Sequence, residues 1–249
     1  MVLAPIKCPH CRSTDVRKGG FINKTEKQRY HCQNDHCKKY FLDEYKNKAC
    51  DPSVREKIYI MTVNGNGTRA IARSLGISTN TVTSVLRNIE ADLWFVNYDY
   101  IRQHNDSGME IDIVPVDEAE MDEMWSFVHD KSQQYWLWWA IDHNTGVPLA
   151  FCFGTREYKY LDNLLELLLP FNIKIVYTDD NPAYDSKITH SCLVTGKENT
   201  QKIERKHLSL RTWCSRLVRK GIRFSKRHDM HRIVVALVIN FWFFCRVLW

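Results

Sequence analysis

Four of the nine cysteines fall within residues 8–37, and their spacing limits the fold more than any other feature. They form a C-x2-C pair and a C-x4-C pair separated by 20 residues. Two such pairs are typical of a zinc ribbon, in which two knuckles at hairpin tips close one tetrahedral Zn²⁺. A segment this short has little core without the metal. We therefore predict a zinc ribbon over residues 1–50, with His36 as an alternative ligand. The expected ligands are Cys8, Cys11, Cys32 and Cys37.

Residues 51–92 have the apolar periodicity of three short helices. Pro52 starts the first helix, a run of Asn and Gly at residues 64–67 ends it, and Gly76 separates the second helix from the third. The small Ala72 in the second helix, followed by a glycine turn, is the pattern of a DNA-binding helix-turn-helix. A generic three-helix piece is the alternative. The residues expected at the groove and its phosphates are Arg69, Arg73, Thr79, Asn80, Thr83, Ser84 and Arg87.

After a connector predicted at residues 93–110, the pattern changes to strands. Three consecutive hairpin strands are followed by helix, strand, helix, strand and helix, which is the order of a ribonuclease-H-like fold. We therefore expect a mixed α/β catalytic domain over residues 111–249, in an α+β chain of several domains. The expected strands are residues 121–128, 135–142, 147–153, 173–177 and 192–195, and the expected helices are 160–169, one starting near 182, and 200–220.

Three carboxylates take distinctive places in this pattern. Asp179 ends the fourth strand, where open α/β sheets place their ligands. Glu204 follows 25 residues later, in the basic helix. In the first strand, alternation puts Glu120 and Asp122 on one face, so either residue can supply the third carboxylate. Asp180 is a further ligand candidate.

Clustered carboxylates are typical of phosphodiester chemistry. Oxygen ligands hold hard ions such as Mg²⁺ or Mn²⁺, and two such ions activate a nucleophile and stabilise the leaving oxygen. On the basic helix, Glu204, His207 and Arg211 recur at i, i+3 and i+7 and share a face. The guanidinium of Arg211 is suited to hold a phosphate beside the metal site.

The charge is unevenly distributed along the chain. Residues 1–109 hold 17 Lys/Arg against 11 Asp/Glu, residues 110–199 hold 6 against 16, and residues 200–249 hold 12 against 2. Basic ends around an acidic middle predict contact with a polyanion and a cation site between them. Scattered cysteines outside the ribbon indicate reduced thiols in a cytosol. The apolar residues 233–249 are interrupted by Asn240 and Arg246, which favours a buried helix over a membrane span.

Several motifs together resemble one protein family. They are Ala-Ile-Ala-Arg-Ser-Leu-Gly-Ile in the helix-turn-helix, Glu-Met-Asp-Glu-Met-Trp, Tyr-Thr-Asp-Asp, Arg-Phe-Ser-Lys at residues 223–226, and the most specific tract, residues 201–211. The chain is similar, almost end to end, to bacterial transposases of the insertion-sequence-one family. This resemblance implies a DDE transposase whose triad is Asp122, Asp179 and Glu204, with Arg211 as the basic residue seven positions later. It selects Asp122 over Glu120.

The resemblance also implies the partners. The ribbon and the helix-turn-helix are expected to bind the element's terminal inverted repeats, and the catalytic domain to cut these ends and join them to target DNA. Joining two ends implies a homodimer or higher oligomer on double-stranded DNA, in the bacterial cytoplasm at the nucleoid, without a membrane role. In this family the two halves can be fused by frameshifting. The alternatives are a DNA-binding repressor with an inert catalytic domain and a structure-directed nuclease of ribonuclease-H-like fold.

Overall fold

The computed structural model describes residues 5–22, 27–103, 116–188, 192–218 and 220–248. It divides into two compact units. The first holds the ribbon and most of the helix-turn-helix, up to residue 60 and over residues 68–85. The second holds residues 61–67 and the chain from residue 86 onward. Residues 104–110 of the predicted connector and residues 111–115 of the predicted catalytic domain lie outside the described residues.

In the first unit, a small antiparallel sheet carries the cysteine pairs. Strands β1 (Val16–Phe21), β2 (Gln28–Cys32) and β3 (Tyr40–Leu42) pair in that order. Each cysteine pair sits in a tight turn. Arg12, at φ 60°, follows the first pair and Lys38, at φ 47°, follows the second. The turns bring both pairs to one end of the sheet, as the ribbon prediction requires.

The three predicted helices of residues 51–92 are confirmed as α1 (Pro52–Val63), α2 (Thr68–Leu75) and α3 (Thr79–Asn88). Ala72 is buried at mid-helix in α2. Gly76, at φ +62°, makes the turn after α2 in a left-handed conformation that side chains resist. The Ser78 hydroxyl then accepts the backbone N–H of Thr81 at 3.0 Å, so Ser78 is the N-terminal cap of α3.

A five-stranded sheet, in order β6-β5-β4-β7-β8, is the centre of the second unit as described. Strands β4 (Glu118–Phe127), β5 (Gln134–Asp142) and β6 (Pro148–Gly154) are antiparallel hairpin neighbours. Strands β7 (Ile175–Thr178) and β8 (Cys192–Thr195) add in parallel beside β4. This is the ribonuclease-H-like arrangement that the order of elements predicts.

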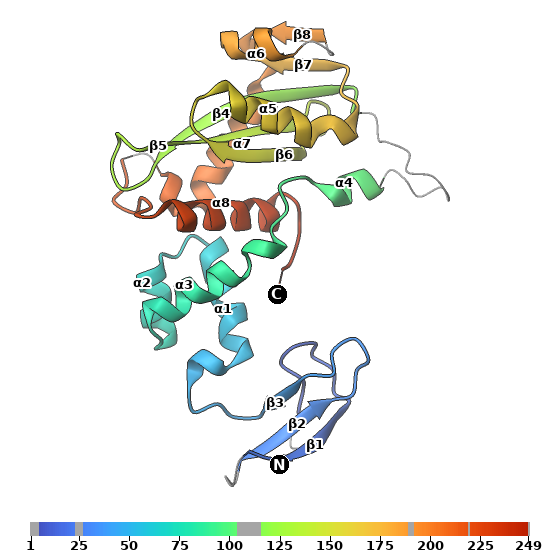
Figure 1. Cartoon of the computed structure of the whole chain (residues 1–249), viewed down its shortest axis with the longest axis vertical. Helices are drawn as coiled ribbons and strands as arrows, with labels where there is room; N and C mark the ends of the chain where they lie inside the picture. The colour runs from blue at the N-terminus through green and yellow to red at the C-terminus, as the bar shows by residue number, and fades with distance from the viewer. Residues whose placement is uncertain (1–4, 23–26, 104–115, 189–191, 219, 249) are drawn as a thin grey trace. The chain divides into compact units, whose positions relative to one another are not determined.

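Helices cover both faces of this sheet (Figure 1). Helix α5 (Tyr158–Leu168) and the short α6 (Pro182–Lys187) lie on one face, over a core that includes Met121, Trp138 and Tyr184. Helix α7 (Gln201–Trp213) packs on the other face of β4. The acidic residues of β4 therefore point alternately toward α6 and toward α7.

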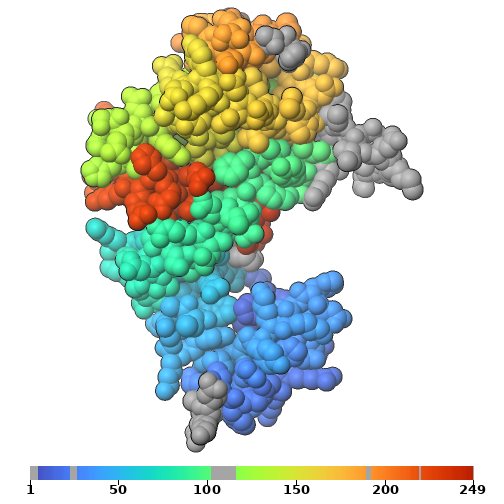
Figure 2. Space-filling model, in the orientation of Figure 1, coloured from blue at the N-terminus to red at the C-terminus, as the bar shows by residue number. Residues whose placement is uncertain are grey.

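The part of the predicted connector that is described packs tightly on the second unit. After α3 the chain forms α4 (Tyr98–Gln103). The Phe95 carbonyl accepts the N–H of Phe151, and the Asn97 side chain donates to the Pro148 carbonyl, both on β6. In Figure 2 this segment, in green, lies beside the red C-terminal helix, from which the Asn240 amide donates to the Trp94 carbonyl. Residues 95–97 thus pair with β6 at the edge of the sheet, bridged through Val96 and Ala150.

The basic helix is shorter than the predicted residues 200–220. Helix α7 ends at Trp213, and a single 3-10 turn, Ser215–Leu217, follows. The chain leaves the helix because doing so buries Leu217 and lets the guanidinium of Arg216 donate to the Ser225 hydroxyl and the Met230 carbonyl. The predicted C-terminal helix is α8 (His228–Trp242), buried over most of its length, and no described helix is long and apolar enough to cross a bilayer.

One buried histidine links α8 to the sheet. His231 is 1% exposed, and its two ring nitrogens lie 3.2 Å from the Ser126 hydroxyl and 2.9 Å from the Ser225 hydroxyl. Burial, and then the positive charges of Arg216 and His228, lower the pKa of His231 to about 3. The folded chain therefore keeps this ring neutral at pH values where an unfolded chain protonates it.

We expect this histidine to make the second unit less stable in acid. Below about pH 6.5 the unfolded state takes up a proton that the folded state does not bind until about pH 3. The free energy of unfolding should fall across that window by up to ~1.4 kcal/mol per pH unit. Urea unfolding at pH 7.5 and pH 5 should show a smaller loss for His231→Gln than for the wild type. The exposed His129→Gln is the control, and equal losses in all three proteins would contradict the assignment.

Candidate active site and nucleic-acid interface

Three carboxylates meet where β7 ends beside β4. One ligand oxygen of each of Asp122, Glu123 and Asp179 lies within 4.8 Å of the others, and we call this set the acidic cluster. Asp122 and Glu123 are on β4, and Asp179 directly follows β7. Because β7 pairs with β4 only over Glu118–Glu120 in the described chain, its end leaves room for the three side chains.

The electrostatics of the cluster favour a bound cation. Burial, followed by the charges of Glu123, Asp179 and Glu204, raises the pKa of Asp122 to about 7. Burial is also the first cause that raises the pKa of Glu123. Like charges held together in a half-buried site repel one another, and a divalent cation removes that repulsion. The donor set, three hard oxygens, suits Mg²⁺ or Mn²⁺.

Glu123 is the member that the sequence pattern did not single out. Its side chain is 4% exposed and accepts hydrogen bonds from the Asn181 amide and the Tyr184 hydroxyl, each at 2.9 Å. Arg156 lies 3.4 Å from the same carboxylate. Alternation places Glu123 on the α6 face of β4 and Asp122 on the opposite face. Beyond the end of β7 no described strand covers this edge of β4, so both carboxylates can reach around it and meet. Only its position next to Asp122 hinted at a role.

Asp122 is oriented from the α7 side by a histidine. His207 is buried, and its Nδ1 lies 3.5 Å from Asp122 Oδ2. The indole N–H of Trp139 donates to His207 Nε2 at 2.7 Å, and the two ring planes are only 9° apart. An indole nitrogen can only donate, so Nε2 must accept and the proton of the neutral ring is on Nδ1. The N–H of His207 therefore faces Asp122.

The structure separates Glu120 from Asp122, which alternation alone left equivalent. Glu120 is 1% exposed, and its carboxylate accepts the backbone N–H of Ile203 in the first turn of α7. Its other oxygen lies 2.9 Å from His143 Nδ1. Glu120 thus caps a helix, and it is Asp122 that lies in the acidic cluster.

Of the other predicted site residues, Glu204 is the one whose charge acts on the cluster. Glu204 is exposed in the first turn of α7, and its charge contributes to the raised pKa of Asp122. Arg211 lies two turns later on α7 and is half-buried. Asp180 is exposed directly after Asp179. The structure therefore brings Asp122 and Asp179 together and holds Glu204 close by, with Glu123 as an added carboxylate.

The four predicted ribbon ligands form a second candidate metal centre. The sulfur atoms of Cys8, Cys11, Cys32 and Cys37 lie within 4.8 Å of one another. The Cys8–Cys37 and Cys11–Cys32 sulfur pairs are 3.8 and 3.4 Å apart. Burial and the neighbouring thiols raise the pKa of Cys32 to about 12. His36 is exposed and is not one of this group.

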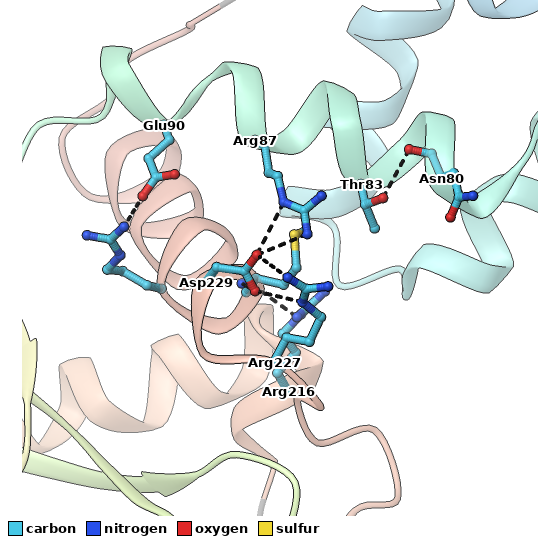
Figure 3. Close-up of polar contacts among 9 residues, drawn as sticks. Asn80, Thr83, Arg87, Glu90, Arg216, Arg227 and Asp229 are labelled. Carbon is cyan, nitrogen blue, oxygen red and sulfur yellow. Dashed lines mark hydrogen bonds and ion pairs between the residues drawn. The ribbon is translucent and has the colours of Figure 1, made fainter.

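The predicted DNA-contacting residues lie on α2 and α3. Thr83 is partly exposed and the other six are exposed, and the Thr83 hydroxyl donates to the Asn80 carbonyl within α3. Arg87 is not pointing freely into solvent. Its guanidinium donates to Asp229 Oδ2 at 3.2 and 3.0 Å, and Arg227 holds the same carboxylate (Figure 3). Burial raises the pKa of Asp229. Hydrogen bonds from Arg227 and the Met230 N–H outweigh that effect and help to lower the pKa to about 2.

A ribonuclease-H-like sheet with carboxylates gathered at the ends of β4 and β7, joined to a helix-turn-helix, defines the class of DDE transposases. A sequence model of IS1 transposases matches residues 116–245. A second model, described as the InsA C-terminal domain, matches residues 45–90. The chain belongs to the IS1 transposase family. It is therefore a DNA transposase, with DNA binding through its helix-turn-helix.

Individual relatives agree with this assignment. The chain is 43% identical over 122 residues to the insertion element iso-IS1n protein InsB of Shigella dysenteriae, covering 49% of this chain and 93% of that protein. It is 41% identical to the insertion element IS1 9 protein InsB of Escherichia coli K12, covering 49% of this chain and 73% of that protein. A solved BIV integrase catalytic core covers 50% of this chain and 82% of its own, at 15% identity and a TM-score of 0.35, and supports no conclusion by itself.

Proposed function

We propose that this transposase binds the terminal inverted repeats of its own insertion sequence and cuts and joins DNA at Asp122, Asp179 and Glu204. The observation that carries the catalytic part is the meeting of Asp122 and Asp179 in a site that raises the pKa of Asp122 to about 7. We assign recognition to a ribbon over residues 1–50 and a helix-turn-helix over residues 51–92. Catalysis is assigned to residues 111–249, beyond the connector at 93–110.

Two Mg²⁺ or Mn²⁺ ions are the cofactors that we assign to the carboxylates. Bound there, they would activate a water or a 3′-hydroxyl and stabilise the leaving oxygen. Neighbouring side chains orient the carboxylates that would hold these ions. His207 points its N–H at Asp122, and Asn181 and Tyr184 hold Glu123 against Asp179. Arg211, on the same helix as Glu204, is assigned to hold a DNA phosphate.

We expect Asp179→Asn to abolish strand transfer while leaving the fold intact. Losing an outer-shell partner of a metal site already costs about 10–100-fold in activity or affinity, so losing a ligand should cost more. The measurement is joining of labelled terminal-repeat DNA to a target duplex in Mg²⁺. Asp180→Asn is the matched control, because the neighbouring carboxylate is exposed and lies outside the acidic cluster. Undiminished joining by Asp179→Asn would refute the catalytic assignment.

The recognition surface is assigned to Arg69, Arg73, Thr79, Asn80, Thr83, Ser84 and Arg87. Exposure of these residues around the α2–α3 turn supports the assignment. The pairing of Arg87 with Asp229 does not oppose it, because both side chains are partly exposed and such ion pairs contribute only about 0–1 kcal/mol. A DNA base or phosphate can therefore displace Asp229 at little cost.

We expect Arg87→Ala and Asp229→Asn to change repeat binding in opposite directions. Losing the Arg87 guanidinium should weaken binding to a terminal-repeat duplex by about 1–3 kcal/mol. Asp229→Asn should strengthen it, because Arg87 is then released from its carboxylate partner. Electrophoretic mobility shifts on repeat and scrambled duplexes measure both affinity and preference. If Arg87→Ala keeps the same preference for the repeat, α3 does not read the repeat through this residue.

Zinc is the metal that we assign to the cysteine group. A tetrahedron with Zn–S bonds of about 2.3 Å has edges of about 3.8 Å, which the 3.8 and 3.4 Å sulfur separations approach. Thiolates also select zinc over harder ions. The sheet around the site has only a small apolar core of its own, centred on Phe41. The metal would therefore supply most of the stability of the ribbon.

We expect one zinc per chain in the purified protein and close to none in Cys32→Ser. Elemental analysis after dialysis measures the stoichiometry, and Cys50→Ser, which changes an exposed cysteine outside the group, should keep its zinc. Losing the metal should also weaken repeat binding, since the ribbon is part of the proposed recognition surface. Full zinc content in Cys32→Ser would contradict the ligand assignment.

Transposition joins two element ends, so we assign a homodimer or higher oligomer as the active form on double-stranded DNA. We assign its place of action to the bacterial cytoplasm, at the nucleoid, where element ends and target DNA are found. Reduced cysteines fit that compartment.

A further inference from the structure

A cleft that the carboxylate chemistry does not use opens beside the far end of β4. Its volume is about 650 Å³. The walls are the end of β4, the turn that leads into β5, and residues 216–218, 220, 221 and 224 from the chain after α7. All of these segments belong to the second unit.

One wall is a row of aromatic rings. Trp125 and Phe127 have ring centroids 5.6 Å apart, and Phe127 and Phe224 have centroids 5.3 Å apart. All three rings line the cleft and are only partly buried. Partly exposed rings with faces open to a cleft are suited to stack on another planar ring.

The tract at residues 223–226 is held rigidly in place. The Ser225 carbonyl accepts the N–H of His129 at 2.7 Å, and Ser225 bridges in parallel to Val128. The Ser225 hydroxyl also accepts from Arg216 and lies 2.9 Å from His231 Nδ1. Because Ser225 is anchored on three sides, the neighbouring Phe224 is presented to the cleft in a fixed position, at little entropic cost on binding.

The rim of the cleft is positively charged. Lys131 and Lys220 lie there, Arg216 lies deeper with its guanidinium bonded to Ser225 and Met230, and Asp130 is the acidic residue among the lining. The Asp130 carboxylate is already engaged by Ser132 and His129, whose hydrogen bonds lower its pKa to about 2. Basic side chains beside an aromatic wall are what proteins use to bind single-stranded nucleic acid, through backbone phosphates and stacked bases.

The cleft lies within reach of a strand held at the acidic cluster. Trp125 is two residues beyond Glu123 of the cluster and on the same face of β4, which is about 7 Å at about 3.3 Å per residue. A nucleotide one or two positions from a phosphate at the cluster can therefore reach the rings.

We propose that this cleft binds an unstacked nucleobase, with its adjacent phosphate, from the DNA strand that is being cut or joined. The inference rests on the proposed function, since that function places a DNA strand at the acidic cluster. Trp125 and Phe224 stack on the base, and Lys131 and Lys220 contact the phosphate. The cleft recognises an unpaired base near the element end but does not distinguish one base from another, because every base offers a planar face.

Affinity for single strands tests the cleft without relying on the recognition of repeats or on chemistry. The full-length, zinc-loaded protein is titrated, without added Mg²⁺ or Mn²⁺, with a fluorescent oligothymidylate and with an abasic strand of equal length. The wild type should prefer the strand with bases by about tenfold, and Trp125→Ala and Phe224→Leu should reduce that preference toward none. Tyr158→Ala, which removes an exposed ring on α5, should keep it. Equal loss of affinity for both strands would overturn the proposal, because it would mean that the rings do not bind bases.

Photocrosslinking the wild-type protein gives a second readout that needs no variant. Terminal-repeat DNA with unpaired 5-iodouracil at its end should crosslink to the peptides that contain Trp125 or Phe224. Crosslinks confined to the ribbon or the helix-turn-helix would overturn the proposal. Repeat binding and strand transfer are measured on separate duplex DNA, so a failure of the proposed function appears there and is distinguishable from a failure of the cleft.

Discussion

A single buried carboxylate, that of Glu120, holds helix α7 against the sheet. It accepts the N–H of Ile203, one of the helix donors that lack an intrahelical partner, and pairs with His143 on the same side. Without it, a buried N–H would lose its partner. Because α7 also carries Glu204 and His207, this contact helps to place both of them beside Asp122. The geometry of the candidate site therefore depends on a carboxylate that lies outside the acidic cluster.

The acidic cluster opposes folding and is maintained by its surroundings. Like charges at Asp122, Glu123 and Asp179 repel, and burial strengthens that repulsion. Tyr184 and Asn181 hold Glu123, while Trp139 sets the tautomer of His207 that faces Asp122. Such violations of ordinary burial rules are expected at functional sites. The cleft around Trp125 and Phe224 is likewise organised before any ligand arrives, through the hydrogen bonds of Ser225.

Much of the fold could be predicted from local pattern. The cysteine spacing, the glycine turn at Gly76 and the alternation of β4 each depend on short-range geometry. These features lead to the ribbon turns, the helix-turn-helix and the hairpin strands that the structure contains. The basic helix was predicted too long, because its end at Trp213 is decided by the burial of Leu217 and by the distant partners of Arg216. Residues 93–103 were predicted to be a connector because the residues they contact, on β6 and α8, are distant in the sequence.

The sequence by itself determined the order of the elements, the residue types of both candidate metal sites and the family. It could not choose between Glu120 and Asp122 from alternation, because side chains two apart on a strand share a face whatever lies above them. Tertiary structure gave the two carboxylates different surroundings by placing the start of α7 over Glu120 and His207 beside Asp122. It alone brought Glu123 to Asp179, because the early end of β7 lets side chains from opposite faces of β4 meet at one edge.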